Sequence, residues 1–288
     1  MKLALGTAQF GSPYGIANQS GQVSREEVKE ILTIARLNYI DTLDTAITYG
    51  ESEACLGEVG LDGFKVITKL PAFSENIQNI NSWVNNQMQA SLKRLNTSSL
   101  YATLLHRPEQ LLTSKGDDLW RSLEKLKEDG VVKKIGISIS DPSELDYLIN
   151  SFSIDLVQTP FNLVDQRLSL SGWLEKLNTL GIEVHTRSAF LQGLLLMPVT
   201  AIHEKFKFWL PLFNTWHDWL LDNNTSAVEA CIGFVQAYSQ IDKMVVGVDS
   251  TQQLKQLIQA EKKPSNSVWP DINCSDRDLI NPANWNIL

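Results

Sequence analysis

Residues 39–50 read YIDTLDTAITYG, an apolar run that ends in carboxylates and leads to a tyrosine. A short apolar run of this kind predicts a buried strand. Asp44 closes the run five residues before Tyr49, whereas Asp41 lies three residues deeper. Because side chains alternate across a strand, we expect Asp41 to point to the opposite face and to belong to the scaffold. Asp44 is then the candidate functional carboxylate at the carboxyl end of the strand.

Eight such runs alternate with helical patterns along the chain. They cover residues 2–5, 39–43, 65–70, 102–106, 134–139, 155–159, 182–186 and 243–248. Eight strands separated by helices predict an α/β fold with a parallel sheet, and the number favours closure into a (β/α)8 TIM barrel. An open doubly wound sheet is the alternative, although no G-x-G-x-x-G follows the first strand. We expect residues 1–288 to form one barrel domain.

The ends of several helices carry capping residues. Ser24 begins an S-R-E-E run, and Asp141 precedes a proline and a glutamate, as residues do at helix starts. Gly130 and Gly181 each precede a predicted strand, where a left-handed residue ends a helix. Ser250 starts another helix directly after the last strand. These local signals agree with the barrel.

One long segment is irregular. Residues 195–224, between the seventh strand and its helix, are rich in tryptophan and phenylalanine. A loop of this length is typical of an active-site cover, and an extra amphipathic helix packed on the barrel is an equal alternative. A C-terminal tail is expected from about residue 264.

The composition limits the classes of partner. With 43% hydrophobic and 20% charged residues, the 288-residue chain can build a large core. A net charge of −8 argues against nucleic acid or an anionic membrane as a partner, because both bind basic surfaces. The N-terminus lacks the apolar core of a signal peptide, and no apolar run reaches the length of a membrane span. We expect a cytoplasmic protein with a small-molecule partner.

The cysteines do not form a recognisable framework. Cys55, Cys231 and Cys274 are scattered and lack C-x-x-C spacing. They therefore predict neither disulfide bonds nor a metal site.

Polar residues close several of the predicted strands. In a barrel, functional groups gather at the carboxyl ends of the strands, and Asp44, Lys69 and His106 end three successive strands. Taken singly they have ordinary interpretations as a helix cap, a surface lysine and a core histidine. Together with Tyr49 they describe a device in which an ammonium, held by a carboxylate, stabilises a phenolate beside a histidine that orients a carbonyl.

These residues lie in motifs that resemble the aldo-keto reductases, a family of (β/α)8-barrel oxidoreductases that use NADPH or NADH. Asp44-Thr-Ala-Ile-Thr-Tyr49-Gly, Thr-Lys69 and Leu-His106-Arg-Pro are similar to its active-site motifs. Segments 136–138, 158–162, 190–195 and 247–253 resemble its segments after strands five to eight. The order is the same from residue 5 to about residue 257, and the pattern is similar to a bacterial branch associated with sugar metabolism.

The resemblance implies a role for each catalytic residue. Tyr49 would be the general acid that protonates a carbonyl oxygen. Lys69, paired with Asp44, would stabilise the phenolate, and His106 would orient the carbonyl. The implied reaction is reduction of an aldehyde or ketone to an alcohol by NAD(P)H.

The resemblance also implies a set of nucleotide-binding residues. Ser138 and Gln158 would hold the nicotinamide carboxamide, and the turn at 247–253 would receive the adenosine end on free backbone amides. The full set of expected cofactor-binding residues is Gly6, Thr7, Ser138, Gln158, Arg187, Ser188, Phe190, Gln192, Gly193, Gly247, Asp249, Ser250 and Gln253.

Two positions depart from the family pattern. Many relatives have a tyrosine that stacks on the nicotinamide where this chain has Arg187. That arginine can stack through its guanidinium, reach an anionic group of the substrate, or form a salt bridge at the rim. Asp249 stands where relatives that prefer NADPH carry a basic residue, which favours tolerance of NADH. The alternative is that Lys255, on the following helix, supplies the missing positive charge.

The substrate and the reaction class leave alternatives open. Candidate substrate contacts are Tyr14, Phe73, Trp269, Trp285 and the aromatic residues of 195–224. A Schiff-base aldolase or isomerase that uses Lys69 would also explain a buried lysine. A non-catalytic subunit that senses nicotinamide nucleotides would explain the scaffold but has no need for Tyr49.

Overall fold

A closed barrel of eight parallel strands forms the centre of the computed structural model, which describes residues 2–16, 18, 20–263 and 268–286. Each strand pairs with the next along the chain, and the last pairs with the first. The (β/α)8 prediction is therefore confirmed. The strands are β1 (Leu3–Gly6), β2 (Thr42–Asp44), β3 (Lys65–Leu70), β4 (Leu100–Leu105), β5 (Val132–Ser138), β6 (Leu156–Pro160), β7 (Glu183–Arg187) and β8 (Lys243–Gly247).

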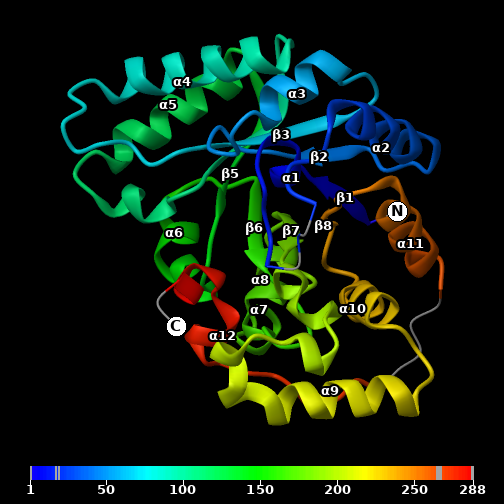
Figure 1. The fold of residues 1–288 in the computed structure, drawn as a ribbon. Helices are drawn as coiled ribbons and strands as arrows, with labels where there is room; N and C mark the ends of the chain where they lie inside the picture. The colour runs from blue at the N-terminus through cyan, green and yellow to red at the C-terminus, as the bar shows by residue number, and fades with distance from the viewer. Residues whose placement is uncertain (1, 17, 19, 264–267, 287–288) are drawn as a thin grey trace.

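Helices surround the barrel, as Figure 1 shows. Apolar side chains on their inner faces pack against the outer faces of the strands in one continuous core. The main helices are α2 (Arg25–Leu37), α3 (Ser52–Val59), α4 (Ile80–Leu95), α5 (Gly116–Glu128), α6 (Leu145–Ser151), α8 (Trp173–Thr179), α10 (Ala227–Gln236) and α11 (Thr251–Glu261). Shorter helices are α1 (Ala8–Gly11) and α7 (Arg167–Leu170).

The predicted helix ends agree with the structure. Ser24 caps α2, Ser250 caps α11, and the Asp141 capping box precedes α6. Gly130 and Gly181 adopt φ angles of 71° and 70°, in the left-handed region where glycine is favoured. The second strand is shorter than predicted, because residues 38–40 still belong to the turn that ends α2.

The segment at 195–224 is mostly helical and is not a long loop. Short 3-10 turns fill much of its first half, and helix α9 (Leu210–Asp222) follows and lies along the outer edge of the molecule in Figure 1. Phe206, Phe213 and Trp216 are fully buried. Of the two alternatives, the structure has the extra helix packed on the barrel, because these aromatic side chains need a core to cover them.

The C-terminal tail ends in α12 (Arg277–Ile280) and a 3-10 turn, η6 (Pro282–Asn286). Trp285 is buried and its indole donates to the carbonyl of Leu279. Trp269 packs on Trp219 and Phe234. Both tryptophans therefore anchor the tail. Residues 264–267, where the tail is expected to begin, lie outside the described residues. No described helix combines the length and apolar character that crossing a bilayer requires.

Candidate active site

A cavity of about 890 Å³ opens at the carboxyl ends of the strands. All eight strands, or the loops that follow them, contribute to its lining. Its wall includes Asp44, Tyr49 and His106 from the predicted catalytic set. Lys69 lies beneath the wall, with 1% of its side chain exposed. The predicted catalytic residues are thus brought together at one place.

The base of the site is a buried ion pair. Lys69 Nζ donates to Asp44 Oδ2 at 2.6 Å and to the carbonyl of Thr45 at 3.0 Å. The ammonium lies 5.1 Å from the centre of the Tyr49 ring. Burial acts to lower the pKa of Lys69, but the Asp44 carboxylate and the Tyr49 phenol outweigh it, and the net shift is upward. Lys69 therefore stays charged beside the tyrosine at neutral pH.

Tyr49 and His106 face each other above this pair. Their ring centres lie 6.1 Å apart in an edge-to-face arrangement. Burial, followed by the charges of Lys69 and Arg187, lowers the pKa of His106 to about 4. The imidazole is consequently neutral at pH 7, so that one ring nitrogen donates a hydrogen bond without carrying a charge.

Close backbone packing fixes the loop that carries Tyr49. A Cβ placed on Gly11 would lie 1.8 Å from the carbonyl oxygen of Tyr49, so only glycine lets α1 approach this loop. Ser52, just after the loop, donates to the hydroxyl of Thr7 at 2.8 Å, and Thr7 donates to the carbonyl of Asp44 at 3.0 Å. The first strand and α1 therefore position the tyrosine relative to the ion pair.

Gln158 reaches across the barrel to the same carboxylate. Its Nε2 donates to Asp44 Oδ1 at 2.7 Å, and its Oε1 accepts from the Ser138 hydroxyl at 3.3 Å. Both Asp44 oxygens are thus occupied, one by Lys69 and one by Gln158. Ser138 and Gln158 both line the cavity.

The loop after β7 has an unusual backbone. Ser188, Leu191 and Gln192 have φ angles of 62°, 48° and 53°, and Gly193 has 94°. Non-glycine residues enter this region at a cost of about 1–2 kcal/mol each, which is typical of functional loops. Ser188, Phe190, Gln192 and Gly193 all line the cavity. Asn162 supports the loop from behind, since its Nδ2 donates to the carbonyl of Ser188 at 2.9 Å.

The turn after β8 differs from the expectation of free backbone amides. The amide of Asp249 donates to Gln253 Oε1 at 2.7 Å, and that of Thr251 donates to Glu27 Oε1 at 2.5 Å. The amide of Gln253 donates to Ser250, which caps α11 and does not line the cavity. Three backbone amides of this turn therefore already donate hydrogen bonds to protein oxygen atoms. The carboxylates of Asp249 and Glu27 lie beside the turn.

A sequence model of the aldo/keto reductase family matches residues 2–272. The chain belongs to the aldo/keto reductase family. Among curated relatives, it is 27% identical over 194 residues to glyoxal reductase of Bacillus subtilis, covering 65% of this chain and 66% of the relative. It is 29% identical over 136 residues to an aldo-keto reductase of Mycolicibacterium smegmatis, covering 45% and 46%. The matches thus span less than two thirds of each relative's own length.

Solved structures of aldo-keto reductases share the fold. The holo form of aldo-keto reductase AKR11C1 from Bacillus halodurans superposes with a TM-score of 0.74 at 18% identity, covering 92% of this chain and 88% of that one. The glycerol dehydrogenase AKR11B4 from Gluconobacter oxydans gives 0.72 at 19% identity, with the same coverage. At this identity the likeness concerns the barrel alone.

The cavity of this aldo/keto reductase contains most of the residues expected from sequence. The expected cofactor-binding residues that line it are Gly6, Thr7, Ser138, Gln158, Arg187, Ser188, Phe190, Gln192, Gly193, Gly247, Asp249 and Gln253. Tyr14, an expected substrate contact, also lines it. Phe73, Trp269 and Trp285 do not line it.

Several lining residues were not predicted. Thr48 and Arg107 directly adjoin Tyr49 and His106 in the sequence, so their position next to expected site residues could have predicted them. Asn281, Pro282 and Ala283 come from the C-terminal tail and carry no such signal.

Proposed function

We propose that this member of the family reduces an aldehyde or ketone to an alcohol with NAD(P)H, and that Tyr49 is the general acid. One observation carries the proposal. The Tyr49 ring lines the cavity directly above the charged Lys69, whose own carboxylate partner is already satisfied. Such a cation favours release of the phenolic proton, because it stabilises the phenolate that remains.

Each catalytic residue has a distinct task. Tyr49 donates its hydroxyl proton to the carbonyl oxygen of the substrate. Lys69, which Asp44 keeps charged, stabilises the phenolate that proton transfer leaves behind. Neutral His106 donates a hydrogen bond to the same carbonyl oxygen and orients it toward Tyr49.

The donor set of the cavity fits a nicotinamide nucleotide. Ser138 and Gln158 offer a hydroxyl and an amide suited to a carboxamide, and the left-handed loop at 188–193 turns polar groups to the cavity. Gly247, Asp249 and Gln253 would hold the adenosine end, with ribose hydroxyls donating to the Asp249 carboxylate. When bound, this cofactor supplies the hydride, and the chain supplies position and charge.

The turn after β8 favours NADH over NADPH. An additional phosphate on the adenosine ribose would meet the carboxylates of Asp249 and Glu27 and would find the amides already bonded. We expect kcat/KM to be at least about 10-fold higher with NADH, as one unfavourable charge contact implies. A preference for NADPH would contradict this assignment.

The experiment that tests the proposed function is an absorbance assay of NADH and NADPH oxidation with a panel of carbonyl compounds. The panel contains simple aldehydes, aldoses and ketoses, and glyoxal, because a curated relative is named glyoxal reductase. A sugar-derived carbonyl compound is one candidate substrate class. We expect oxidation that depends on both the nucleotide and the carbonyl compound. Its absence with every member of the panel would contradict the proposal.

The geometry disfavours a Schiff-base enzyme. Lys69 is held charged by Asp44 and does not line the cavity, so its nitrogen is neither neutral nor accessible to a carbonyl carbon. Trapping of a substrate adduct by borohydride would reverse this conclusion. A subunit that only senses nucleotide has no use for Tyr49 and His106 in the cavity wall.

A further inference from the structure

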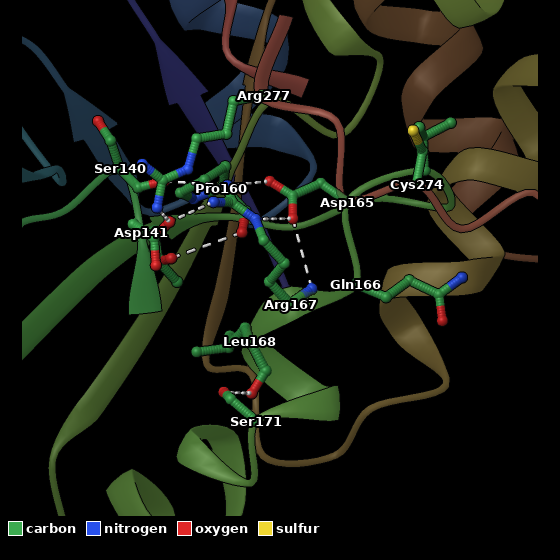
Figure 2. Close-up of polar contacts among 12 residues, drawn as sticks. Ser140, Asp141, Pro160, Asp165, Gln166, Arg167, Leu168, Ser171, Cys274 and Arg277 are labelled. Carbon is green, nitrogen blue, oxygen red and sulfur yellow. Dashed lines mark hydrogen bonds and ion pairs between the residues drawn. The ribbon is translucent and has the colours of Figure 1, made fainter. Parts of the chain in front are cut away.

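Two of the three arginines around the turn after β5 are neutralised. Arg167 donates to Asp141 Oδ2 at 2.7 Å and to both oxygens of Asp165 at 2.8 Å. Arg277, from the C-terminal tail, donates to the same Asp141 oxygen at 2.9 Å. Arg167 also donates to the carbonyl of Ser140 at 3.0 Å. Figure 2 shows both guanidinium groups converging on these carboxylates.

Arg187 lies on the cavity side of the same turn and has no such partner. Its Nη2 donates to the carbonyl of Ile139 at 3.1 Å and to Ser140 Oγ at 3.4 Å. Its Nη1 donates to Ser188 Oγ at 3.4 Å. All three acceptors are neutral, and two of the bonds are long. Within the described part of the chain, no carboxylate lies at ion-pair distance from Arg187.

The guanidinium is nevertheless held in place. Arg167 and Glu144 hold the backbone of Ser140, the former through its carbonyl and the latter through its amide. This turn therefore holds one side of the Arg187 guanidinium, through the carbonyl of Ile139 and the hydroxyl of Ser140. Because a guanidinium has five N–H donors, the group keeps donors available to the cavity. A half-buried cation with neutral partners is costly unless an anion completes its coordination.

The field of Arg187 reaches the reacting groups. After burial and Lys69, its charge is a further cause of the lowered pKa of His106. It also acts on Tyr14, whose pKa is raised chiefly by burial. The Lys69–Asp44 pair is neutral overall, so Arg187 gives this end of the cavity a positive charge in a chain whose net charge is −8. A positive charge in the wall of a cavity attracts anionic ligands.

We propose that Arg187 binds an anionic group of the substrate, either carboxylate or phosphate, and so selects carbonyl compounds that carry a negative charge. The inference rests on the proposed function for the reaction itself. Of the three interpretations of Arg187, the salt bridge at the rim is excluded. Arg167 and Arg277 bind Asp141 and Asp165, and Glu144 accepts from the backbone amides of the turn. Contact with the nicotinamide is the remaining alternative and is an outcome of the test.

The test compares charged and neutral carbonyl compounds of matched size. Succinic semialdehyde is paired with its methyl ester, and glyceraldehyde phosphate is paired with glyceraldehyde, so that the two pairs distinguish carboxylate from phosphate. We expect kcat/KM to favour the anionic member of at least one pair. In Arg187→Gln that preference falls by about 10- to 100-fold, as loss of a charge-assisted hydrogen bond implies. Arg187→Lys retains part of it, because the charge remains but the planar fork is lost.

Arg107→Gln is the matched control. This arginine also lines the cavity, but its side chain is 66% exposed and lies 3.9 Å from Glu109. We expect the preference for anions to change less than about twofold there. Equal losses in the two variants would show a general effect of charge and would overturn the assignment to Arg187.

Two further readouts separate the alternatives. A weaker Kd for NADH in Arg187→Gln with an unchanged preference for anions would assign Arg187 to the cofactor and overturn the inference. If no carbonyl compound is reduced, the proposed function fails, and calorimetric titration with succinate still decides the inference. The same titration is made with glycerol phosphate. Binding of either anion that Arg187→Gln weakens at least 10-fold supports the inference, and absent or unchanged binding of both overturns it.

Discussion

The two ends of the barrel carry the same four kinds of ionisable group, a carboxylate, an ammonium, a phenol and an imidazole, in different arrangements. The carboxyl end has Asp44, Lys69, Tyr49 and His106. The amino end has Glu183, Lys134, Tyr101 and His185. Only the first set surrounds the cavity described above. The presence of these residue types therefore does not by itself predict an active site.

At the amino end, every group bonds to the carboxylate. The Tyr101 hydroxyl donates to Glu183 Oε2 at 2.7 Å, Lys134 donates to the same oxygen, and His185 Nε2 lies 2.6 Å from Glu183 Oε1. Burial acts to raise the pKa of Glu183, but His185, Lys134 and Tyr101 together lower it to about 2. The Tyr101 hydroxyl is thus bonded within a structural network and is not available to a ligand.

At the carboxyl end, the carboxylate is satisfied without the tyrosine. Lys69 and Gln158 take the two oxygens of Asp44, which leaves Tyr49 and His106 facing the cavity. The two ends thus differ in which groups remain available to a ligand, and the proposed function depends on this difference.

The largest expected effect follows removal of one hydroxyl at each end. Tyr49→Phe removes the proton donor and should lower kcat by about 10²- to 10⁴-fold, the usual contribution of a general acid. Tyr101→Phe should leave kcat within about twofold and cost about 1 kcal/mol of stability, because it removes one hydrogen bond. Steady-state kinetics and urea unfolding measure both. A comparable loss of turnover in the two variants would contradict the contrast.

The next effect concerns the two lysines. Lys69→Met leaves Asp44 buried and unpaired, which should destabilise the fold by about 3–5 kcal/mol and abolish most turnover. Lys134→Met removes a partly exposed partner of Glu183, which keeps Tyr101 and His185, and should cost no more than about 1 kcal/mol. Urea unfolding of both variants tests the difference. The double variant Lys69→Met with Asp44→Asn should recover stability but not activity, and recovery of activity would contradict the role of Lys69.

The pH dependence of stability should separate the two ends. The pKa of His106 is about 4 in the folded state against 6.5 in the unfolded state, so the unfolded chain binds more protons between these values. Stability should therefore fall as the pH decreases from 6.5 to 4, by about 1–3 kcal/mol. In His106→Gln this part of the slope should disappear. An unchanged slope in that variant would show that the imidazole titrates normally.

Glu183 should affect the pH dependence of stability in a lower pH range than His106 does. Its pKa is about 2 in the folded state against 4.5, so its contribution to stability is present above pH 4.5 and is lost as the pH falls toward 2. Glu183→Gln should flatten the unfolding free energy in that range only. Lys134 and His185 lose their carboxylate partner in the variant at every pH, so the change of unfolding free energy with pH, and not its absolute value, is the quantity to compare. Loss between pH 4 and 6.5 instead would contradict the assignment.

Local patterns in the sequence predicted the barrel and much of the site. Short apolar runs, caps such as Ser24 and left-handed glycines act over a few residues, and they agree with the folded structure. Asp44, Lys69 and His106 were expected to lie close together because the carboxyl ends of all strands meet at one end of the barrel. Those inferences need no knowledge of distant contacts.

Other features depend on contacts between distant residues. Gln158 bonds Asp44 across 114 residues, and Glu27 bonds the amide of Thr251 across 224 residues. Both contacts exist only after closure of the sheet, so the amides at 247–253 were expected to be free. The return of residues 281–283 to the cavity likewise depends on α12. The helix at 210–222 could not be told from a loop, because the sequence there has no clear capping residue and its aromatic residues do not follow a clear helical period.

The central claim is that a carbonyl compound is reduced in this cavity by hydride transfer. NADH that carries deuterium at its transferable position, incubated with the enzyme and a carbonyl compound of the panel, tests it most directly. We expect mass spectrometry to show an alcohol with one deuterium on the former carbonyl carbon. Tyr49→Phe should form at least about 10²-fold less of this product in the same time. Alcohol without deuterium, or no alcohol from the wild-type enzyme with any compound of the panel, would contradict the claim.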